Sequence, residues 1–267
     1  MQNLHSHTTY CDGSLTPEEM VQAAIAKGCD SFGFSGHSYA PFDPYHCMSK
    51  ENTRLYLRDG ERLKEKYAGE IELFFGIEQD FYSDGPPTGF DFVIGTVHYL
   101  KINGEYVCVD AGAKSQMLAV ETEFGGDYYA FVEEYYATIA DIKKTGADFV
   151  GHFDIVTKYN FEGSLFDEMH PRYVSAAIDA MNEILKTHRL FEINTGAMYR
   201  LGKTMQYPST FLLKELHERG GEIILSSDSH DAESICWKFD EMLELIRSIG
   251  FKHIKQLTKD GFTDVEI

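Results

Sequence analysis

The stretch LHSHTTYCDGSLTPEEMVQAAIAKGCDSFGFSGH, residues 4–37, contains the unit whose repetition decides the fold. It begins and ends with short apolar runs of strand length. Between these runs, Thr16, Pro17 and Glu19 form a helix start with a capping box, and Gly28 stands where a helix ends. The order strand, helix, strand predicts two parallel strands joined by a crossover helix.

The same alternation continues along the chain. Short runs rich in Phe, Val or Ile occur at residues 4–7, 31–35, 71–77, 90–97, 147–151, 190–193 and 222–225. Helix patterns occur at residues 17–27, 49–67, 128–145, 170–188, 208–219 and 238–249. Seven such units predict an α/β fold with a closed or nearly closed parallel barrel, and an open doubly wound sheet is the alternative.

We expect one domain over residues 1–267, because no repeat, low-complexity tract or linker divides the chain. Residues 100–127 resemble an insertion after the fourth strand. Within it, residues 101–109 have Asn103-Gly104 at their centre, which predicts a hairpin. The segment after Phe251 is expected to add a last strand and a tail.

The composition excludes several kinds of partner. The chain has 24 Lys and Arg against 43 Asp and Glu, and a net charge of -19 argues against binding long nucleic acids or anionic membranes. No apolar run approaches the roughly 18 residues of a membrane span, and the first residues lack the features of a signal peptide. Five cysteines without a CxxC spacing are typical of reduced thiols and predict a cytoplasmic protein. The composition does not indicate the oligomeric state.

Every strand candidate ends in residues of the types that bind metal ions. These are His5, His7, Asp12, His37, Glu78, His98, His152, Asp154, Glu192, Asn194, Asp228 and His230. A single histidine at a strand end is usually only hydrogen-bonded, but burying so many imidazoles and carboxylates together without cations is costly. The C-terminal strand ends of a parallel barrel meet at one face, so the pattern predicts a metal centre there. The other five histidines fall in loops or helices and are expected at the surface.

Nitrogen and oxygen ligands without thiolates indicate Zn, Mn or Fe. The set exceeds the needs of one tetrahedral ion, so two or three divalent ions are predicted, with Glu78 bridging two of them. Centres of this kind promote displacement at phosphorus or hydrolysis at a carbonyl.

Seven motifs occur in a characteristic order: His5-Ser6-His7-Thr8, Cys11-Asp12-Gly13, Ser35-Gly36-His37, Gly76-Ile77-Glu78, Gly95-Thr96-Val97-His98, Gly151-His152 and Ser227-Asp228-Ser229-His230. Over about residues 3–250 the chain resembles the polymerase and histidinol phosphatase (PHP) family, and within it the stand-alone histidinol-phosphate phosphatases. The resemblance implies a distorted (βα)7 TIM-like barrel with three metal ions. Their ligands would be His5, His7, Glu78 and Asp228 for the first, Glu78, His98 and His152 for the second, and Asp12, His37 and His230 for the third. The chain departs from the family pattern at Asn3 and at Gly36, where the family commonly has acidic residues.

The resemblance also implies an activity, the hydrolysis of L-histidinol phosphate to L-histidinol and phosphate in histidine biosynthesis. Glu78 is expected to act in catalysis by bridging two ions, and His230 or Asp154 to protonate the leaving alkoxide. Lys158 and Arg200 are the candidates to bind the phosphate.

Other hypotheses remain open from the sequence. A phosphoesterase of the same family could act on another small phosphate ester, such as a nucleotide. An amidohydrolase is disfavoured because Glu78, rather than a lysine, ends the middle strand. A metal-binding protein without catalysis is disfavoured because every expected ligand position is filled.

Overall fold

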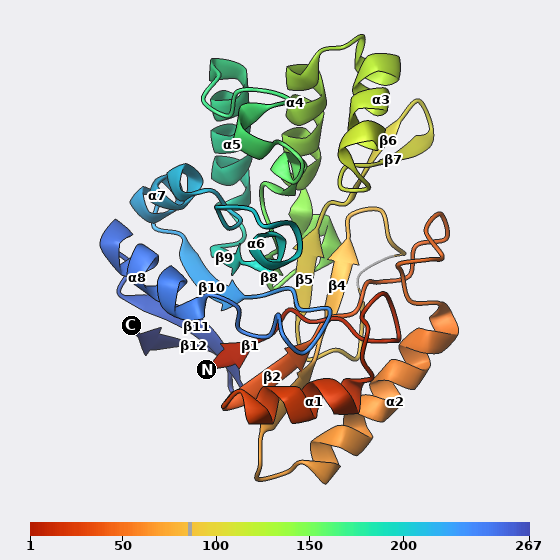
Figure 1. Ribbon diagram of the computed structural model, residues 1–267, viewed down its shortest axis with the longest axis vertical. Helices are drawn as coiled ribbons and strands as arrows, with labels where there is room; N and C mark the ends of the chain where they lie inside the picture. Colours follow the sequence, from red (N-terminus) through yellow and green to blue (C-terminus); the bar gives the residue numbers. More distant parts are fainter. Residues whose placement is uncertain (85–86) are drawn as a thin grey trace.

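A ring of short parallel strands forms the centre of the computed structural model, which describes residues 1–84 and 87–267 (Figure 1). The ring consists of β1 (Gln2–Asn3), β2 (Ser31–Phe34), β3 (Glu72–Phe75), β4 (Ile77–Asp80), β5 (Val93–Thr96), β8 (Phe149–Val150), β9 (Leu190–Asn194) and β10 (Glu222–Ser226). These strands pair in parallel in two sheets, with the orders β1-β2-β3 and β10-β9-β8-β5-β4. Only Gly76 separates β3 from β4, so the two segments occupy one of seven strand positions.

Main-chain hydrogen bonds join the two sheets on both sides. On one side, the amide of Gly76 donates to the carbonyl of Phe34 in the first sheet at 2.8 Å, and the amide of Ile77 donates to the carbonyl of Phe92, next to β5 of the second sheet, at 3.1 Å. On the other side, the amide of His7 donates to the carbonyl of Ser229 at 2.8 Å, and the amide of Ser229 donates to the carbonyl of His5 at 3.1 Å. The sheet is therefore closed, which confirms the predicted distorted seven-stranded barrel and excludes the open sheet.

The helices lie outside the strands (Figure 1). They are α1 (Pro17–Ala26), α2 (Lys50–Lys66), α3 (Ala113–Phe124), α4 (Tyr128–Ile139), α5 (Pro171–Ile184), α6 (Gly196–Leu201), α7 (Thr210–Glu218) and α8 (Phe239–Ile249), with 3-10 turns at Ile142–Thr145, Ile155–Thr157 and Phe161–Gly163. The capping box of α1 is present: the amide of Thr16 donates to Glu19 at 2.8 Å, and the amide of Glu19 donates to Thr16 at 3.3 Å. The sequence pattern missed α3, which lies inside the insertion, and the short α6. No helix in the described ranges is long and apolar enough to cross a membrane.

Two antiparallel hairpins complete the fold. The predicted hairpin is formed by β6 (Tyr99–Ile102) and β7 (Glu105–Cys108), with Asn103 and Gly104 at its turn. At the end of the chain, β11 (His253–Thr258) and β12 (Gly261–Glu266) form a second hairpin rather than the expected single strand and tail.

The second hairpin closes the N-terminal end of the barrel. Leu257 belongs to the same buried apolar cluster as Leu4, Phe149 and Ile224, which come from the barrel strands. The side chain of Gln2 fixes the hairpin by exchanging two hydrogen bonds of 2.8 Å with the main chain of Leu257. Apolar packing therefore anchors the hairpin at this end, and the polar strand-end residues gather at the other end.

Candidate metal centre

The structure brings all nine predicted ligands together at the C-terminal ends of the barrel strands. Their ligating atoms form four groups, and within each group the atoms lie within 4.8 Å of one another. The groups are His5, His7 and Asp228; His5, Glu78 and His152; His37, Glu78 and His98; and His7, Asp12, His37 and His230. The three predicted ligand sets are recognisable, but His5, His7 and His37, like Glu78, each belong to two groups. Only the tertiary structure reveals this sharing.

Glu78 lies at the middle of the centre. Its Oε1 is 2.8 Å from Nε2 of His152 and 3.2 Å from Nε2 of His98. Its Oε2 is 3.0 Å from Nδ1 of His37 and 3.2 Å from Nε2 of His5. His7 also approaches Oε2, with its Nε2 at 3.4 Å. Each carboxylate oxygen therefore faces a different set of imidazoles, which is the arrangement that a bridging ligand requires.

Several buried atoms of the centre lack hydrogen-bond partners among the described residues. They are Nε2 of His5, Nε2 of His7, Oδ1 of Asp12 and Oε2 of Glu78, whose 3.0 Å approach to Nδ1 of His37 does not have the angles of a hydrogen bond. Leaving such atoms buried and unpaired costs about 1–3 kcal/mol each, so their convergence needs an explanation. Cations among them would satisfy their lone pairs, and the nitrogen and carboxylate donors suit Zn, Mn or Fe. The residues present therefore fit the divalent ions that the sequence predicts.

Charge interactions within the centre shift the pKa values of its side chains in both directions. Burial lowers the pKa of His5, His37 and His98, but the neighbouring carboxylates outweigh it and raise all three, so these imidazoles would release protons on binding an ion. Burial, together with the neighbouring His230 and His37, lowers the pKa of His7 to about 3, so its imidazole is neutral at physiological pH. Burial opposes ionisation of Glu78, but the surrounding histidines outweigh it and hold the pKa of Glu78 well below its usual range. Neutral imidazoles and ionised carboxylates are the forms that bind metal ions.

Two further acidic residues, Glu192 and Asp80, contact the predicted ligands without belonging to any of the four groups. Oε1 of Glu192 lies 2.6 Å from Nδ1 of His5, while its Oε2 accepts hydrogen bonds from the amide of His152 at 2.8 Å and from the side chain of Asn194 at 3.0 Å. Asp80 accepts from the amide of His98 at 2.7 Å. The sequence pattern placed Glu192 at a strand end without giving it a role, and it missed Asp80. The position of Asp80 two residues after Glu78 in the same strand was the available signal.

The two departures from the family pattern have local explanations. Asn3 accepts a hydrogen bond from the amide of Ser227 at 2.9 Å and donates one to the carbonyl of His5 at 3.2 Å, which an ionised carboxylate could not do. A Cβ at Gly36 would lie 3.1 Å from the methyl group of Met48, so the packing there leaves little space for a side chain.

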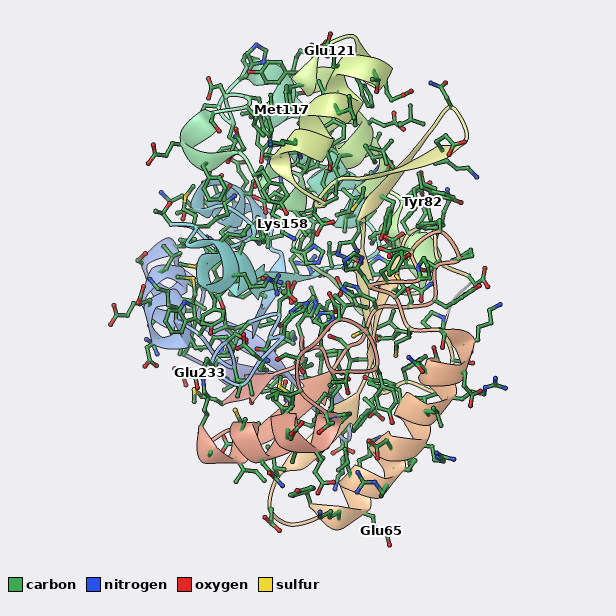
Figure 2. The ribbon with its side chains drawn as sticks, turned by 45° about the vertical axis from the view of Figure 1, so that its right-hand side comes forward. Glu65, Tyr82, Met117, Glu121, Lys158 and Glu233 are labelled. Atoms are coloured by element: carbon green, nitrogen blue, oxygen red, sulfur yellow. The ribbon has the colours of Figure 1, made fainter. Side chains whose placement is uncertain are left out.

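A pocket of about 380 Å³ opens over the centre, and both predicted phosphate-binding residues line it. Arg200 donates to Oδ2 of Asp228 at 2.8 Å, and its other terminal nitrogen lies 2.7 Å from Nδ1 of His230. Lys158 forms an ion pair of 2.8 Å with Asp110. In Figure 2, Lys158 lies near the centre of the view, whereas Glu65 and Glu121 lie toward its two ends. Two cations thus face a pocket in a protein of net charge -19.

The two predicted proton donors lie in different places. His230 lines the pocket, and its Nε2 is 3.2 Å from Oδ2 of Asp12. Asp154 is buried and is not among the residues that line the pocket; its Oδ2 accepts from the amide of Ser209 at 2.9 Å. Burial raises the pKa of Asp154 to about 7.

Of the five histidines expected at the surface, His46 and His253 are exposed, whereas the other three are partly buried. His46 is exposed in the loop after β2 and lines the pocket, with Asp43 accepting from its ring at 2.9 Å.

A larger cavity of about 680 Å³ lies at the opposite end of the barrel, beside the turn of the β11–β12 hairpin. None of the four ligand groups is there, so its size does not make it a reaction site.

A closed parallel barrel with a ring of imidazoles and carboxylates at its C-terminal strand ends defines a metal-dependent α/β-barrel hydrolase. The model of the PHP domain family matches residues 3–196, and the chain belongs to this family.

Similar proteins share almost the full length of the chain. A probable histidinol-phosphatase of Deinococcus radiodurans is 28% identical, covering 94% of this chain and 96% of the relative. A histidinol-phosphatase of Bacillus subtilis is 22% identical, covering 90% and 97%.

Two solved structures have the same fold. A putative histidinol phosphatase from Listeria monocytogenes has a TM-score of 0.75 at 18% identity, and the match covers 90% of this chain and 99% of the Listeria chain. Histidinol phosphate phosphatase from Lactococcus lactis, complexed with zinc, L-histidinol and phosphate, has a TM-score of 0.75 at 21% identity and covers 98% of both chains.

Proposed function

We propose that this protein is a metal-dependent phosphomonoesterase that hydrolyses L-histidinol phosphate to L-histidinol and phosphate, a step of histidine biosynthesis. The observation that carries the proposal is the convergence of four ligand groups on one pocket that also contains Arg200 and Lys158. The full-length likeness to proteins named histidinol-phosphatases supports this choice of substrate. The whole chain, residues 1–267, would act as one domain, and the free thiols and biosynthetic role agree with a cytoplasmic location.

The centre would hold two or three divalent ions of Zn, Mn or Fe. The ligands would be the nine residues His5, His7, Asp12, His37, Glu78, His98, His152, Asp228 and His230. When bound, such ions neutralise phosphate oxygens and lower the pKa of water to supply a nucleophile at neutral pH.

The residues of the chain would position the substrate. Arg200 presents a guanidinium that can bind two phosphate oxygens, and its contact with Asp228 places it at the edge of the centre. Lys158 offers a second cation, held in place by Asp110. The side chain of Lys158 is largely shielded from solvent, which strengthens its attraction for a phosphate, whereas Arg200 is more exposed.

The two roles expected of His230 exclude each other, because both use Nε2. A nitrogen that holds an ion cannot carry a proton at the same time. We assign His230 the ligand role, since its Nε2 lies 3.2 Å from Oδ2 of Asp12 within the fourth group, while Nδ1 lies 2.7 Å from the guanidinium of Arg200, which can only donate. For Asp154 we propose a positioning role, because it holds the amide of Ser209 outside the pocket. The leaving alkoxide would then take its proton from water, which reaches the pocket at its mouth.

A panel of phosphate esters tests the proposed function. Protein loaded separately with zinc or manganese is assayed for phosphate release from L-histidinol phosphate, nucleoside monophosphates and sugar phosphates. The highest kcat/KM is expected for L-histidinol phosphate. Turnover of a nucleotide together with inactivity on L-histidinol phosphate would reject the substrate and retain the chemistry. Inactivity on every ester, with metal bound, would reject both.

A further inference from the structure

Two cysteines that are far apart in the sequence meet on the outer side of the barrel. Cys29 lies between α1 and β2, and Cys236 lies in the segment between β10 and α8. Their sulfur atoms are 3.6 Å apart although 207 positions separate them in the chain, and both thiols are free. Cys29 is 7% exposed and Cys236 is partly exposed, so a small reagent can reach the pair.

The surroundings favour an ionised sulfur at one of the two positions. The thiol hydrogen bond from Cys236 lowers the pKa of Cys29 and raises that of Cys236. The ammonium group of Lys27 is close by, because it donates to the carbonyls of Glu233 at 2.6 Å and Ile235 at 3.1 Å. A thiolate beside cations, with a second thiol in contact, is the arrangement found at cysteines that react with oxidants.

Cys236 is also connected to the metal centre through the main chain. Its φ of 56° lies in the left-handed region, which a residue with a Cβ rarely adopts. Its amide donates to Oγ of Ser227 at 3.0 Å, and Ser227 directly precedes Asp228. Oγ of Ser227 in turn lies 2.7 Å from Oγ of Ser229, beside His230. A displacement of Cys236 therefore acts on the segment that presents two of the proposed ligands.

We propose that Cys29 and Cys236 form a reversible oxidation site that closes to a disulfide in the presence of a hydroperoxide. The Cys29 thiolate attacks the terminal oxygen of the hydroperoxide and the O–O bond breaks, which forms a sulfenic acid. The leaving alkoxide or hydroxide takes up from solvent the proton that Cys29 had released, and departs as alcohol or water. The Cys236 sulfur then attacks the Cys29 sulfur, the S–O bond breaks, and the Cys236 proton leaves with the hydroxide as water. Two thiols are oxidised to one disulfide and one hydroperoxide is reduced.

Bond formation requires a small but definite movement. The sulfur atoms must approach from 3.6 Å to about 2.05 Å, a shift of roughly 1.5 Å. Cys236 is the partner on an irregular segment, so we assign most of the shift to it. The 3.0 Å hydrogen bond from its amide to Ser227 then lengthens, and the disulfide weakens the hold on Asp228 and His230.

The crosslink is tested on the full-length protein loaded with zinc, treated with hydrogen peroxide and then alkylated in denaturant. Two of the five thiols should be lost, and peptide mapping should identify a Cys29–Cys236 crosslink that a dithiol reverses. The variants Cys29→Ser and Cys236→Ser should each form no crosslink, whereas Cys108→Ser should still form it. Absence of the crosslink from the unsubstituted protein would overturn the proposal, whether or not the variants fold.

The coupling to the metal centre is tested by zinc retention rather than by turnover, so that failure of the proposed phosphatase activity cannot be mistaken for its failure. Zinc affinity of the crosslinked protein should fall by about tenfold, as when a group supporting a ligand is lost, and should recover on reduction. Peroxide should leave the zinc affinity of Cys29→Ser unchanged. Unaltered zinc affinity in the crosslinked protein would disprove the coupling through Ser227.

Discussion

The exchange Glu192→Gln tests whether the metal centre depends on a residue that touches no ion. Oε2 of Glu192 accepts two hydrogen bonds, from the amide of His152 and the side chain of Asn194, and Oε1 faces Nδ1 of His5. A glutamine keeps the shape but has only one accepting oxygen. That oxygen is expected to stay with the two donors, which turns the amide NH2 toward His5. Nδ1 of His5 must then accept, so the ring proton moves to Nε2, the atom that faces Glu78 and Asp228.

The magnitude follows from the number of ligands affected. One of the nine proposed ligands is switched to the wrong tautomer, while the other eight keep their contacts. Loss of a partner of this kind costs about 10–100-fold in metal affinity. The expected loss of binding free energy is therefore roughly 1.4–2.7 kcal/mol.

The assay is a competition between the metal-free protein and a chromophoric chelator for zinc. Glu222→Gln is the matched control, because Glu222 is paired with Lys255 at the opposite end of β10, and it should bind zinc like the unsubstituted protein. Nitrogen NMR of the His5 ring in the metal-free variant should show the proton on Nε2. Zinc affinity within about twofold of the unsubstituted protein would refute the reasoning, given the 10–100-fold loss expected.

Four further predictions concern the centre and its pocket. Glu78→Gln should reduce the amount of bound metal and should reduce turnover by about 10²-fold or more, because removing one partner of a buried charge cluster costs about 3 kcal/mol. Full activity with reduced metal content would contradict the bridging role. His230→Asn should lower metal stoichiometry and reduce turnover of aryl and alkyl phosphates alike, whereas intact stoichiometry with a loss confined to alkyl phosphates would indicate a proton donor. Chelation should lower Tm in a thermal melt by roughly 5–10 °C relative to protein at 100 Kd of zinc, since ions that bind only the folded state then contribute about 2.7 kcal/mol; an unchanged Tm would argue against a site linked to folding. Burial opposes ionisation of Asp110, but Lys158 outweighs it and lowers the pKa of Asp110. The ionised carboxylate therefore stabilises the fold above pH about 4, and this contribution is lost as pH falls. Asp110→Asn should flatten the pH dependence of the free energy of unfolding below about pH 4, and an unaltered slope would contradict the ion pair.

Local patterns in the sequence were sufficient for the repeating unit and for the chemical types at the site. The capping box at Thr16 and Glu19 and the Asn103-Gly104 turn are short-range features, and both appear where they were predicted. Six of the seven apolar runs overlap a strand, whereas the first strand is Gln2–Asn3 and precedes the run at residues 4–7. The C-terminal ends of parallel strands meet at one face in any barrel, so the ligand types in the sequence already located the centre.

The tertiary structure alone decided how these parts combine. Closure depends on Ser229 meeting His5 and His7 from the other end of the chain, and the role of Glu192 depends on its contact with His5. The exclusion of Asp154 from the pocket likewise depends on its contact with Ser209. Each of these contacts joins residues that are separated by tens to hundreds of positions. Hydrophobic period and residue type report on neighbours within a turn or a strand, whereas these pairings depend on how strands twist, close and pack across the whole molecule.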